Sequence, residues 1–113
     1  MKKYIPDCYW PETAPGSYVS HEAICVLNTG KSACTVDVTL YFEDREKMGP
    51  FQIVVEAERT KHIRMDLLVN GSGNHIPRAV PYAAVVECED EIAVQYTRLD
   101  TTQNNLALMT AIP

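Results

Sequence analysis

The chain has 113 residues, of which 46% are hydrophobic and 22% are charged, and its formal net charge is −5. This length fits one domain, since a single hydrophobic core occupies roughly 100 to 150 residues, and the composition excludes a disordered chain. The negative charge disfavours nucleic-acid binding, because affinity for phosphate depends on clustered Lys and Arg.

No stretch of the sequence has the character of a membrane span or a signal peptide. A spanning helix needs roughly 20 apolar residues, and residues 1–6 lack the apolar core of a secretory signal. We therefore expect a single cytoplasmic domain over residues 1–113.

Residues 1–16 contain three prolines around the aromatic pair Tyr9 and Trp10. Proline lacks the backbone N–H that a helix needs, so this segment is predicted to be an extended arm with turns. The aromatic pair is expected to pack on its own domain, with stacking on a sugar ring or on a neighbouring subunit as the alternative.

Strand patterns follow in the first half of the chain. Residues 23–27 form a continuous apolar run, which predicts a strand buried on both faces. Residues 35–42 alternate between apolar and polar side chains, and residues 51–55 resume that period, which indicates a hairpin with a long loop. With the strand at 92–97, these segments supply the predicted core residues: Val36, Val38, Leu40, Phe42, Ile53, Val55, Ile92 and Val94.

The second half of the chain also contains short strand patterns. Residues 58–65 are a further strand candidate, and residues 82–86 and 92–97 predict a hairpin around an acidic turn. Residues 106–112 are apolar enough for a last strand, or for a short helix. Seven or eight short strands with Pro and Gly between them predict an all-β antiparallel sandwich, with a barrel as the alternative.

The four cysteines, Cys8, Cys25, Cys34 and Cys88, show neither a C-x-x-C pair nor the spacing of a zinc site. Three of them lie in or beside apolar strand patterns. We interpret them as free structural thiols, with zinc or disulfides as the alternative, and expect no metal site and no cofactor.

A polar strand face is the first candidate for function. Strand alternation places Glu58, Thr60, His62, Arg64 and Asp66 on the same side of their segment. Such a face can be solvated, can form a subunit contact, or can line a shallow cleft that binds a polar ligand. These three interpretations stay open from the sequence.

Arg98 is the second candidate, because the alternation of the preceding residues directs its side chain toward the core. An unpaired guanidinium is costly there, so we expect a carboxylate partner, with Asp100 or Glu22 as first choice. This pair either ties the last strands together or borders a cleft that also contains His62, Arg64 and Gln95.

The run Ser20-His21-Glu22 suggests a hydrolase, but successive strand residues point to opposite faces. These neighbours therefore cannot form a catalytic triad, and we predict no catalytic residues.

Four segments carry a resemblance when they are read together: Ser20-His21-Glu22, Val26-Leu27-Asn28-Thr29-Gly30, Arg59-Thr60-Lys61-His62-Ile63-Arg64 and Gln95-Tyr96-Thr97-Arg98-Leu99-Asp100. In order and spacing they resemble the Anabaena sensory rhodopsin transducer family. The resemblance implies a compact β-sandwich, a homotetramer and a cytoplasmic protein that relays a signal from a membrane photoreceptor. It also implies a fold likened to carbohydrate-binding sandwiches. The chain departs from the cyanobacterial transducer at Tyr96, where that protein has His.

These observations lead to a functional hypothesis. We expect a non-enzymatic ligand-binding or signal-relay module, with a sugar-like metabolite as the ligand, a homotetramer as the assembly and a membrane receptor as a further partner. The predicted ligand-binding residues are Glu22, His62, Arg64, Gln95, Arg98, Asp100 and Trp10. The alternative is a nucleic-acid-linked transcriptional regulator that repeats Arg59, Lys61 and Arg64 across an oligomer.

Overall fold

The computed structural model describes residues 1–11, 20–102 and 107–113. Across these residues the chain is all-β and forms two antiparallel sheets of four strands each, which confirms the predicted sandwich. One short 3-10 helix, η1 (Met65–Leu67), follows the fifth strand. The strands are β1 (Lys2–Tyr9), β2 (His21–Asn28), β3 (Cys34–Phe42), β4 (Met48–Val55), β5 (Arg59–Arg64), β6 (Pro81–Glu87), β7 (Ala93–Asp100) and β8 (Ala107–Ala111).

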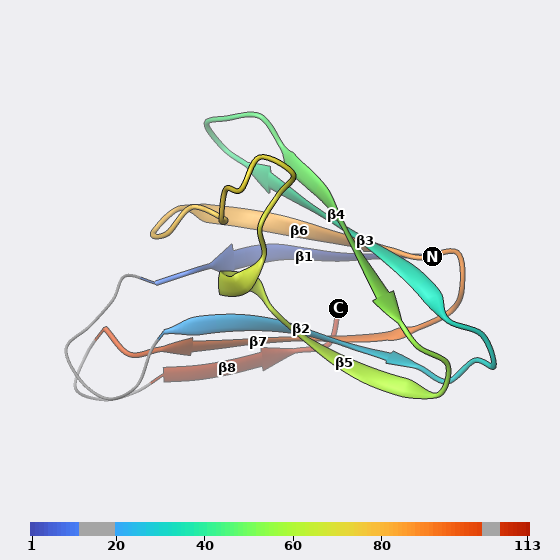
Figure 1. Cartoon of the computed structure of the whole chain (residues 1–113). Coiled ribbons are helices and arrows are strands. Elements are labelled where there is room, and N and C mark those ends of the chain that lie inside the picture. Colours follow the sequence, from blue (N-terminus) through green and yellow to red (C-terminus); the bar gives the residue numbers. More distant parts are fainter. Residues whose placement is uncertain (12–19, 103–106) are drawn as a thin grey trace.

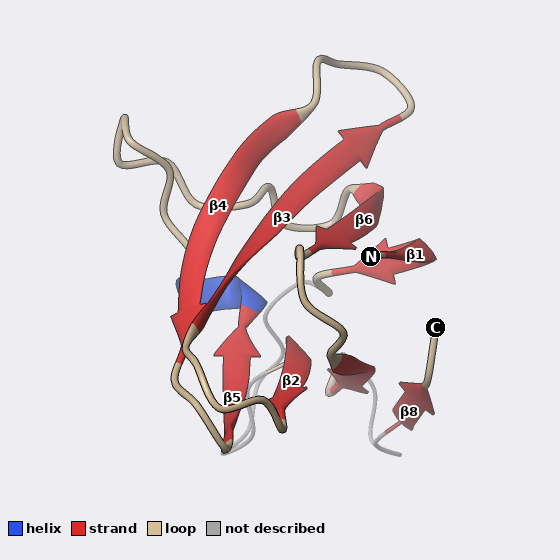
Figure 2. Ribbon diagram, turned by 90° about the vertical axis from the view of Figure 1, so that its right-hand side faces the viewer, coloured by secondary structure: helices blue, strands red, loops and turns tan. Residues whose placement is uncertain are grey.

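The two sheets lie face to face as separate layers (Figures 1 and 2). The first sheet has the strand order β1-β6-β3-β4, and the second has the order β5-β2-β7-β8. Because most neighbours in each sheet are distant in sequence, the chain crosses repeatedly from one layer to the other. Within the described residues, no helix is long and apolar enough to span a membrane.

The core lies between the inner faces of the two sheets. Strand alternation produces it: in β3, Val36, Val38 and Leu40 are fully buried, whereas the residues between them face outward. Six of the eight predicted core residues are buried, and the other two, Phe42 and Ile53, are partly buried and pack against the core.

The structure corrects the prediction for residues 23–27. In β2 buried residues alternate with half-buried or exposed ones, so this strand is buried fully on one face only. The apolar outer residues Ala23, Cys25 and Leu27 lie on the outer surface of the second sheet, where Leu27 is 43% exposed. A continuous apolar run therefore indicated an apolar outer surface here and not burial on both faces.

The N-terminal segment is extended, as predicted, but it is part of the sandwich. Residues 2–9 form edge strand β1, which pairs with β6, and the register shifts between Ile5 and Cys8. Pro6 lies within this irregular stretch, where a missing N–H does not interrupt the ladder. Residues 12–16 of the predicted arm, and residue 106 of the predicted last strand, lie outside the described part.

We predict that Leu40→Ala lowers the free energy of unfolding by about 2–5 kcal/mol, because it leaves a cavity between the two sheets. Leu40 is fully buried. The matched control is Val54→Ala, at a 49% exposed position in the neighbouring strand, which should change stability by about 0.5 kcal/mol or less. Urea denaturation followed by circular dichroism measures both, and equal effects would contradict the assignment of the core.

Candidate functional site

The outer face of the second sheet carries a hollow of ≈ 390 Å³. Cys25 in the centre of β2 pairs with His62 of β5 on one side and with Gln95 of β7 on the other. These three side chains therefore form a row across three strands, on the face that points away from the core. The row forms one wall of the hollow.

The lining of this hollow combines hydrogen-bonding groups with apolar surface. Thr60, His62 and Gln95 are exposed and supply polar groups, while Leu27 is 43% and Ile112 is 82% exposed. This mixture suits a small ligand that presents hydroxyl groups on one side and an apolar face on the other. The sequence had placed His62 and Gln95 together, and the structure brings them together.

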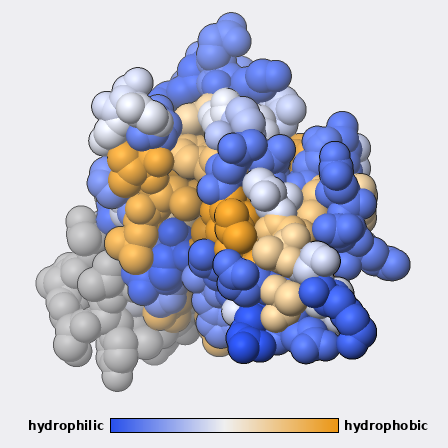
Figure 3. All heavy atoms as spheres, turned by 45° about the vertical axis from the view of Figure 1, so that its right-hand side comes forward, coloured by the Kyte–Doolittle hydropathy of each residue, from blue (hydrophilic) through white to orange (hydrophobic). Residues whose placement is uncertain are grey.

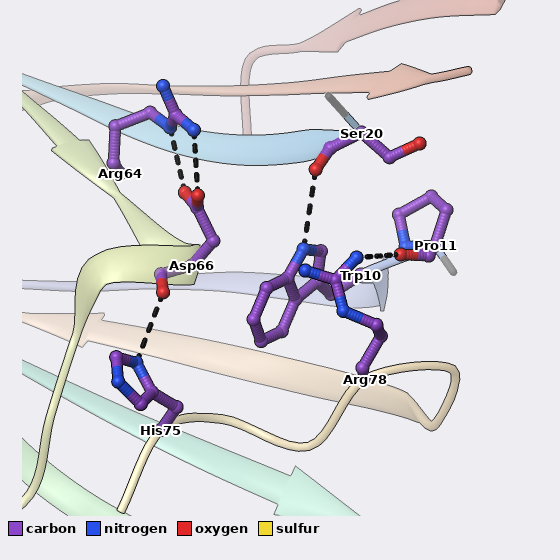
Figure 4. A network of polar contacts seen from close by, with 7 residues as sticks. All are labelled: Trp10, Pro11, Ser20, Arg64, Asp66, His75 and Arg78. Carbon is purple, nitrogen blue, oxygen red and sulfur yellow. Dashed lines mark hydrogen bonds and ion pairs between the residues drawn. The ribbon is translucent and has the colours of Figure 1, made fainter. Parts of the chain in front are cut away.

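Arg64 ends β5 on the same outer face, but an acidic neighbour binds its guanidinium. Its Nε and Nη2 atoms donate to the two carboxylate oxygens of Asp66, each at 2.7 Å (Figure 4). Burial acts to raise the pKa of Asp66, but the hydrogen bonds and charge of Arg64 outweigh it, so that pKa lies below its usual range. The His75 ring contacts the Asp66 carbonyl oxygen at 3.2 Å. Arg64 is thus half of a bidentate ion pair.

Glu22 is fully buried between the sheets and accepts hydrogen bonds from three other strands. Tyr82 donates to its Oε1 at 2.6 Å, the Tyr9 backbone N–H donates to Oε2 at 2.8 Å, and the Tyr96 hydroxyl donates to the same Oε2. A buried carboxylate is tolerated when such donors compensate for lost hydration. Glu22 is therefore a structural centre of the sandwich.

This carboxylate also affects the acidity of its neighbours. Burial, followed by the negative charge of Glu22, raises the pKa of the Tyr82 and Tyr96 hydroxyls well above the ordinary value. The same two causes raise the pKa of the Cys8 thiol to about 12. These groups consequently remain protonated at neutral pH, which keeps the two tyrosines available as hydrogen-bond donors.

The predicted partner of Arg98 is wrong. Its Nη2 atom lies 4.0 Å from Oδ2 of Asp7, whose side chain is 82% exposed, so the ion pair is at the rim of the sandwich. Glu22 is opposite Arg98 in the β2–β7 register, but its oxygens accept hydrogen bonds from tyrosines and from Tyr9 N–H. Asp100 instead accepts hydrogen bonds from the backbone and hydroxyl of Thr102, at 2.9 and 2.6 Å.

Trp10 packs on its own domain, which was the first of its two predicted environments. Its side chain belongs to the core, its indole N–H donates to the Ser20 carbonyl at 3.3 Å, and the Arg78 guanidinium covers the ring at 3.8 Å from the centroid (Figure 4). Arg78 is fixed in turn by a 2.7 Å hydrogen bond to the Pro11 carbonyl. A ring in this environment does not offer a stacking surface to a ligand.

The predicted residues therefore do not share one cleft. His62 and Gln95 lie outside the second sheet, whereas Glu22 and Arg98 lie on its inner side, because alternate residues of a strand point to opposite faces.

Sequence reasoning missed the role of Tyr82. Strand alternation directs Tyr82 and Glu22 inward. Because a buried hydroxyl and a buried carboxylate both need hydrogen-bond partners, their pairing could have been predicted from this pattern.

The fold places the chain among small antiparallel β-sandwich proteins, and comparisons with known proteins agree. It superposes on a crystal structure of Thermotoga maritima protein 1070 with a TM-score of 0.86 and 33% identity, over 98% of this chain and 90% of that chain. A structure of the Anabaena sensory rhodopsin transducer matches with a TM-score of 0.74 and 34% identity, over 84% of this chain and 92% of that chain. No curated protein matches.

The family model of the Anabaena sensory rhodopsin transducer matches residues 2–113. The chain therefore belongs to this family, as the four sequence segments had indicated.

We predict that Tyr82→Phe lowers the free energy of unfolding by about 1.5–3 kcal/mol, because it removes one hydrogen bond to the buried Glu22 carboxylate. Tyr41→Phe is the matched control, since Tyr41 is 43% exposed, and it should be nearly neutral. Denaturant melts measure both changes. If the two variants are equally stable, the hydrogen bond from the Tyr82 hydroxyl to Glu22 does not contribute to the free energy of unfolding.

Proposed function

We propose that this protein is a non-enzymatic signal-relay module of the cytoplasm. Membership of the Anabaena sensory rhodopsin transducer family supports the proposal, as does the placement of the Ser20, His21 and Glu22 run, which directs the central His away from its neighbours. The upstream partner of such a relay is a membrane receptor.

The ligand-binding surface of this module is the hollow beside His62 and Gln95. A hydroxyl-rich ligand of the sugar class fits its lining, because Thr60, His62 and Gln95 offer directional hydrogen bonds next to exposed aliphatic side chains. Trp10 lies elsewhere, so Leu27 and Ile112 provide the apolar contact. The row of His62, Cys25 and Gln95 across three paired strands is the observation that carries this proposal.

The alternative role in nucleic-acid binding has less support. The guanidinium of Arg64 is paired with Asp66, Lys61 donates to the Val54 carbonyl and Arg59 donates to the Glu58 carbonyl. The pairing of Arg64 with Asp66 and the net charge of −5 disfavour phosphate binding.

The module acts as a homo-oligomer, with the tetramer as the expected form. Edge strands need cover, and edge strand β8 carries Leu108, which is 69% exposed, with Ile112 just beyond it at 82%. Apolar side chains also gather among hydrophilic ones on the face drawn in Figure 3. Burial of such surface against a second copy would favour assembly.

We predict that a panel of neutral sugars and polyols contains a ligand whose binding depends on the hollow. His62→Ala and Gln95→Ala should each weaken binding by about tenfold, because each removes a hydrogen bond worth about 1 kcal/mol or more. Gln52→Ala is the matched control for Gln95→Ala, since Gln52 is exposed on the outer face of the other sheet. Isothermal titration calorimetry measures the affinities.

The same experiment separates the two classes of ligand. Affinity for a neutral sugar should stay constant as salt is raised, whereas affinity for a nucleic acid should fall steeply. Binding that is equally weakened by Gln52→Ala, or a panel without any binder, would contradict the ligand proposal.

We predict that light scattering gives a mass that is a multiple of the 12.7 kDa chain at micromolar concentration. Leu108→Lys should reduce this mass, because a charge placed in an apolar interface remains unpaired there. Val69→Lys, at a 45% exposed position in the loop after η1, is the control and should leave the mass unchanged. A single-chain mass for the unmodified protein would refute the oligomer.

A further inference from the structure

Two buried thiols and a carboxylate meet at one end of the two central strands of the first sheet. Cys34 begins β3 and Cys88 directly follows β6, its neighbour in the sheet, while Asp90 lies in the turn beyond. The Cys34 and Cys88 side chains are 5% and 4% exposed, and Asp90 is exposed. The two sulfurs and one carboxylate oxygen all lie within 4.8 Å of one another.

The backbone holds this cluster in place. Cys88 donates its N–H to the Met1 carbonyl at 3.0 Å, and the Met1 amino group donates to the Cys88 carbonyl at 2.7 Å. On the other side, β3 and β6 pair from Asp37 and Glu87 onward. Both thiol-bearing segments are therefore anchored in the sheet, so their side chains are brought together without relying on a mobile loop.

A hollow of ≈ 650 Å³ borders the cluster. The three residues of the cluster line it together with Asp37, Glu87 and Glu89. Its lining contains four carboxylates. Two positive groups lie nearby, the Lys2 ammonium, 3.9 Å from Glu87, and the Met1 amino group, which donates to the Cys88 carbonyl. The carboxylates of the lining outnumber these two groups, so the hollow favours cations.

Asp37 adds an independent observation. Its Oδ1 atom is buried and is the one such side-chain oxygen or nitrogen in the described residues that lacks a hydrogen-bond partner. Asp37 is also directly opposite Glu87 in the strand register, and like charges so placed destabilise each other. The Lys2 ammonium, 3.9 Å from Glu87, already offsets part of this repulsion. A further positive charge in this hollow would compensate the unpaired Asp37 oxygen.

We propose that Cys34, Cys88 and Asp90 bind a thiophilic divalent cation of the zinc type, with the fourth coordination position facing the hollow. Zinc takes thiolate and carboxylate ligands in tetrahedral geometry, with Zn–S distances of about 2.3 Å and Zn–O distances of about 2.0–2.2 Å. Two sulfurs on one such ion are about 3.8 Å apart. The three ligand atoms, all within 4.8 Å of one another, are therefore near the separations that one ion requires.

Binding converts both thiols into thiolates and releases one proton from each. Burial, followed by the proximity of Cys88, raises the pKa of the Cys34 thiol to about 11. In the metal-free protein this thiol is therefore protonated at neutral pH, and the cation must displace its proton. The affinity for metal consequently rises with pH. The bound ion links the start of β3 to the turn after β6.

The test uses the full chain, freed of metal by a chelator and kept reduced with a phosphine. Titration with Co²⁺ should produce thiolate-to-cobalt charge-transfer absorption that saturates at one ion per chain, and Zn²⁺ should displace the cobalt. Cys34→Ser and Cys88→Ser should abolish this absorption. Because even outer-shell partners of metal ligands contribute about 10- to 100-fold to affinity, Asp90→Asn should weaken Zn²⁺ binding by about tenfold or more.

Two controls match these changes. Cys25→Ser removes a thiol on the outer face of the second sheet, and Glu46→Gln removes one negative charge from an exposed position in the loop after β3, outside the lining of the hollow. Both should keep the charge-transfer band and an affinity within about threefold of the unmodified protein. The proposal is overturned if the unmodified protein shows no such band, or if the band survives both cysteine substitutions.

Asp90 is exposed, so its substitution leaves the core intact and keeps the test decisive even where a buried cysteine variant folds poorly. An Asp90→Asn protein that binds Zn²⁺ as tightly as Glu46→Gln would also overturn the proposal.

Discussion

The buried carboxylate of Glu22 is the constraint on which the arrangement of the two sheets depends. Glu22 lies in β2 of the second sheet, yet two of its three donors, Tyr9 N–H and the Tyr82 hydroxyl, belong to the first sheet. A carboxylate removed from water is costly unless such donors reach it, so the sheets must keep the spacing and register that let them do so. Neighbouring contacts reinforce this end of the sandwich, where the Ser20 and Thr101 hydroxyls lie 2.8 Å apart.

Asn28 has the corresponding role at the opposite end of β2. Its side-chain amide donates to the backbone carbonyls of Ser32 and Val55, at 3.0 and 3.2 Å, and its Oδ1 accepts from the Gly30 N–H at 2.9 Å. Val55 ends β4 in the first sheet, so this amide also joins the two layers. The inner face of β2 thus carries a buried polar residue near each end, with aliphatic Ile24 and Val26 between them. Hydrophobic burial supplies the attraction between the sheets, and these polar contacts define their relative position.

Period-two alternation made most of the sandwich predictable, because side-chain direction in a strand follows from sequence position alone. It correctly placed Val38 and Leu40 inside. Pairing between distant strands is different, since it depends on how the chain crosses between layers. The sequence therefore could not show that Arg98 meets Asp7 of β1, or that Cys34 and Asp90 approach each other. Resemblance to the family identified the fold, but strand pairing had to come from the structure. The hairpin predicted for residues 82–86 and 92–97 is wrong, because β6 and β7 belong to different sheets.

The second sheet divides residues that hold the fold from residues that are available for binding. On its inner side, Glu22 and Tyr96 satisfy each other, so their substitution changes stability before it changes any surface. On its outer side, His62 and Gln95 are exposed on strands whose backbones are fixed by pairing with β2. Outer residues of such a sheet can be exchanged without disturbing the packing between the two layers. The side chains of the outer face therefore do not have to meet the packing requirements of the core.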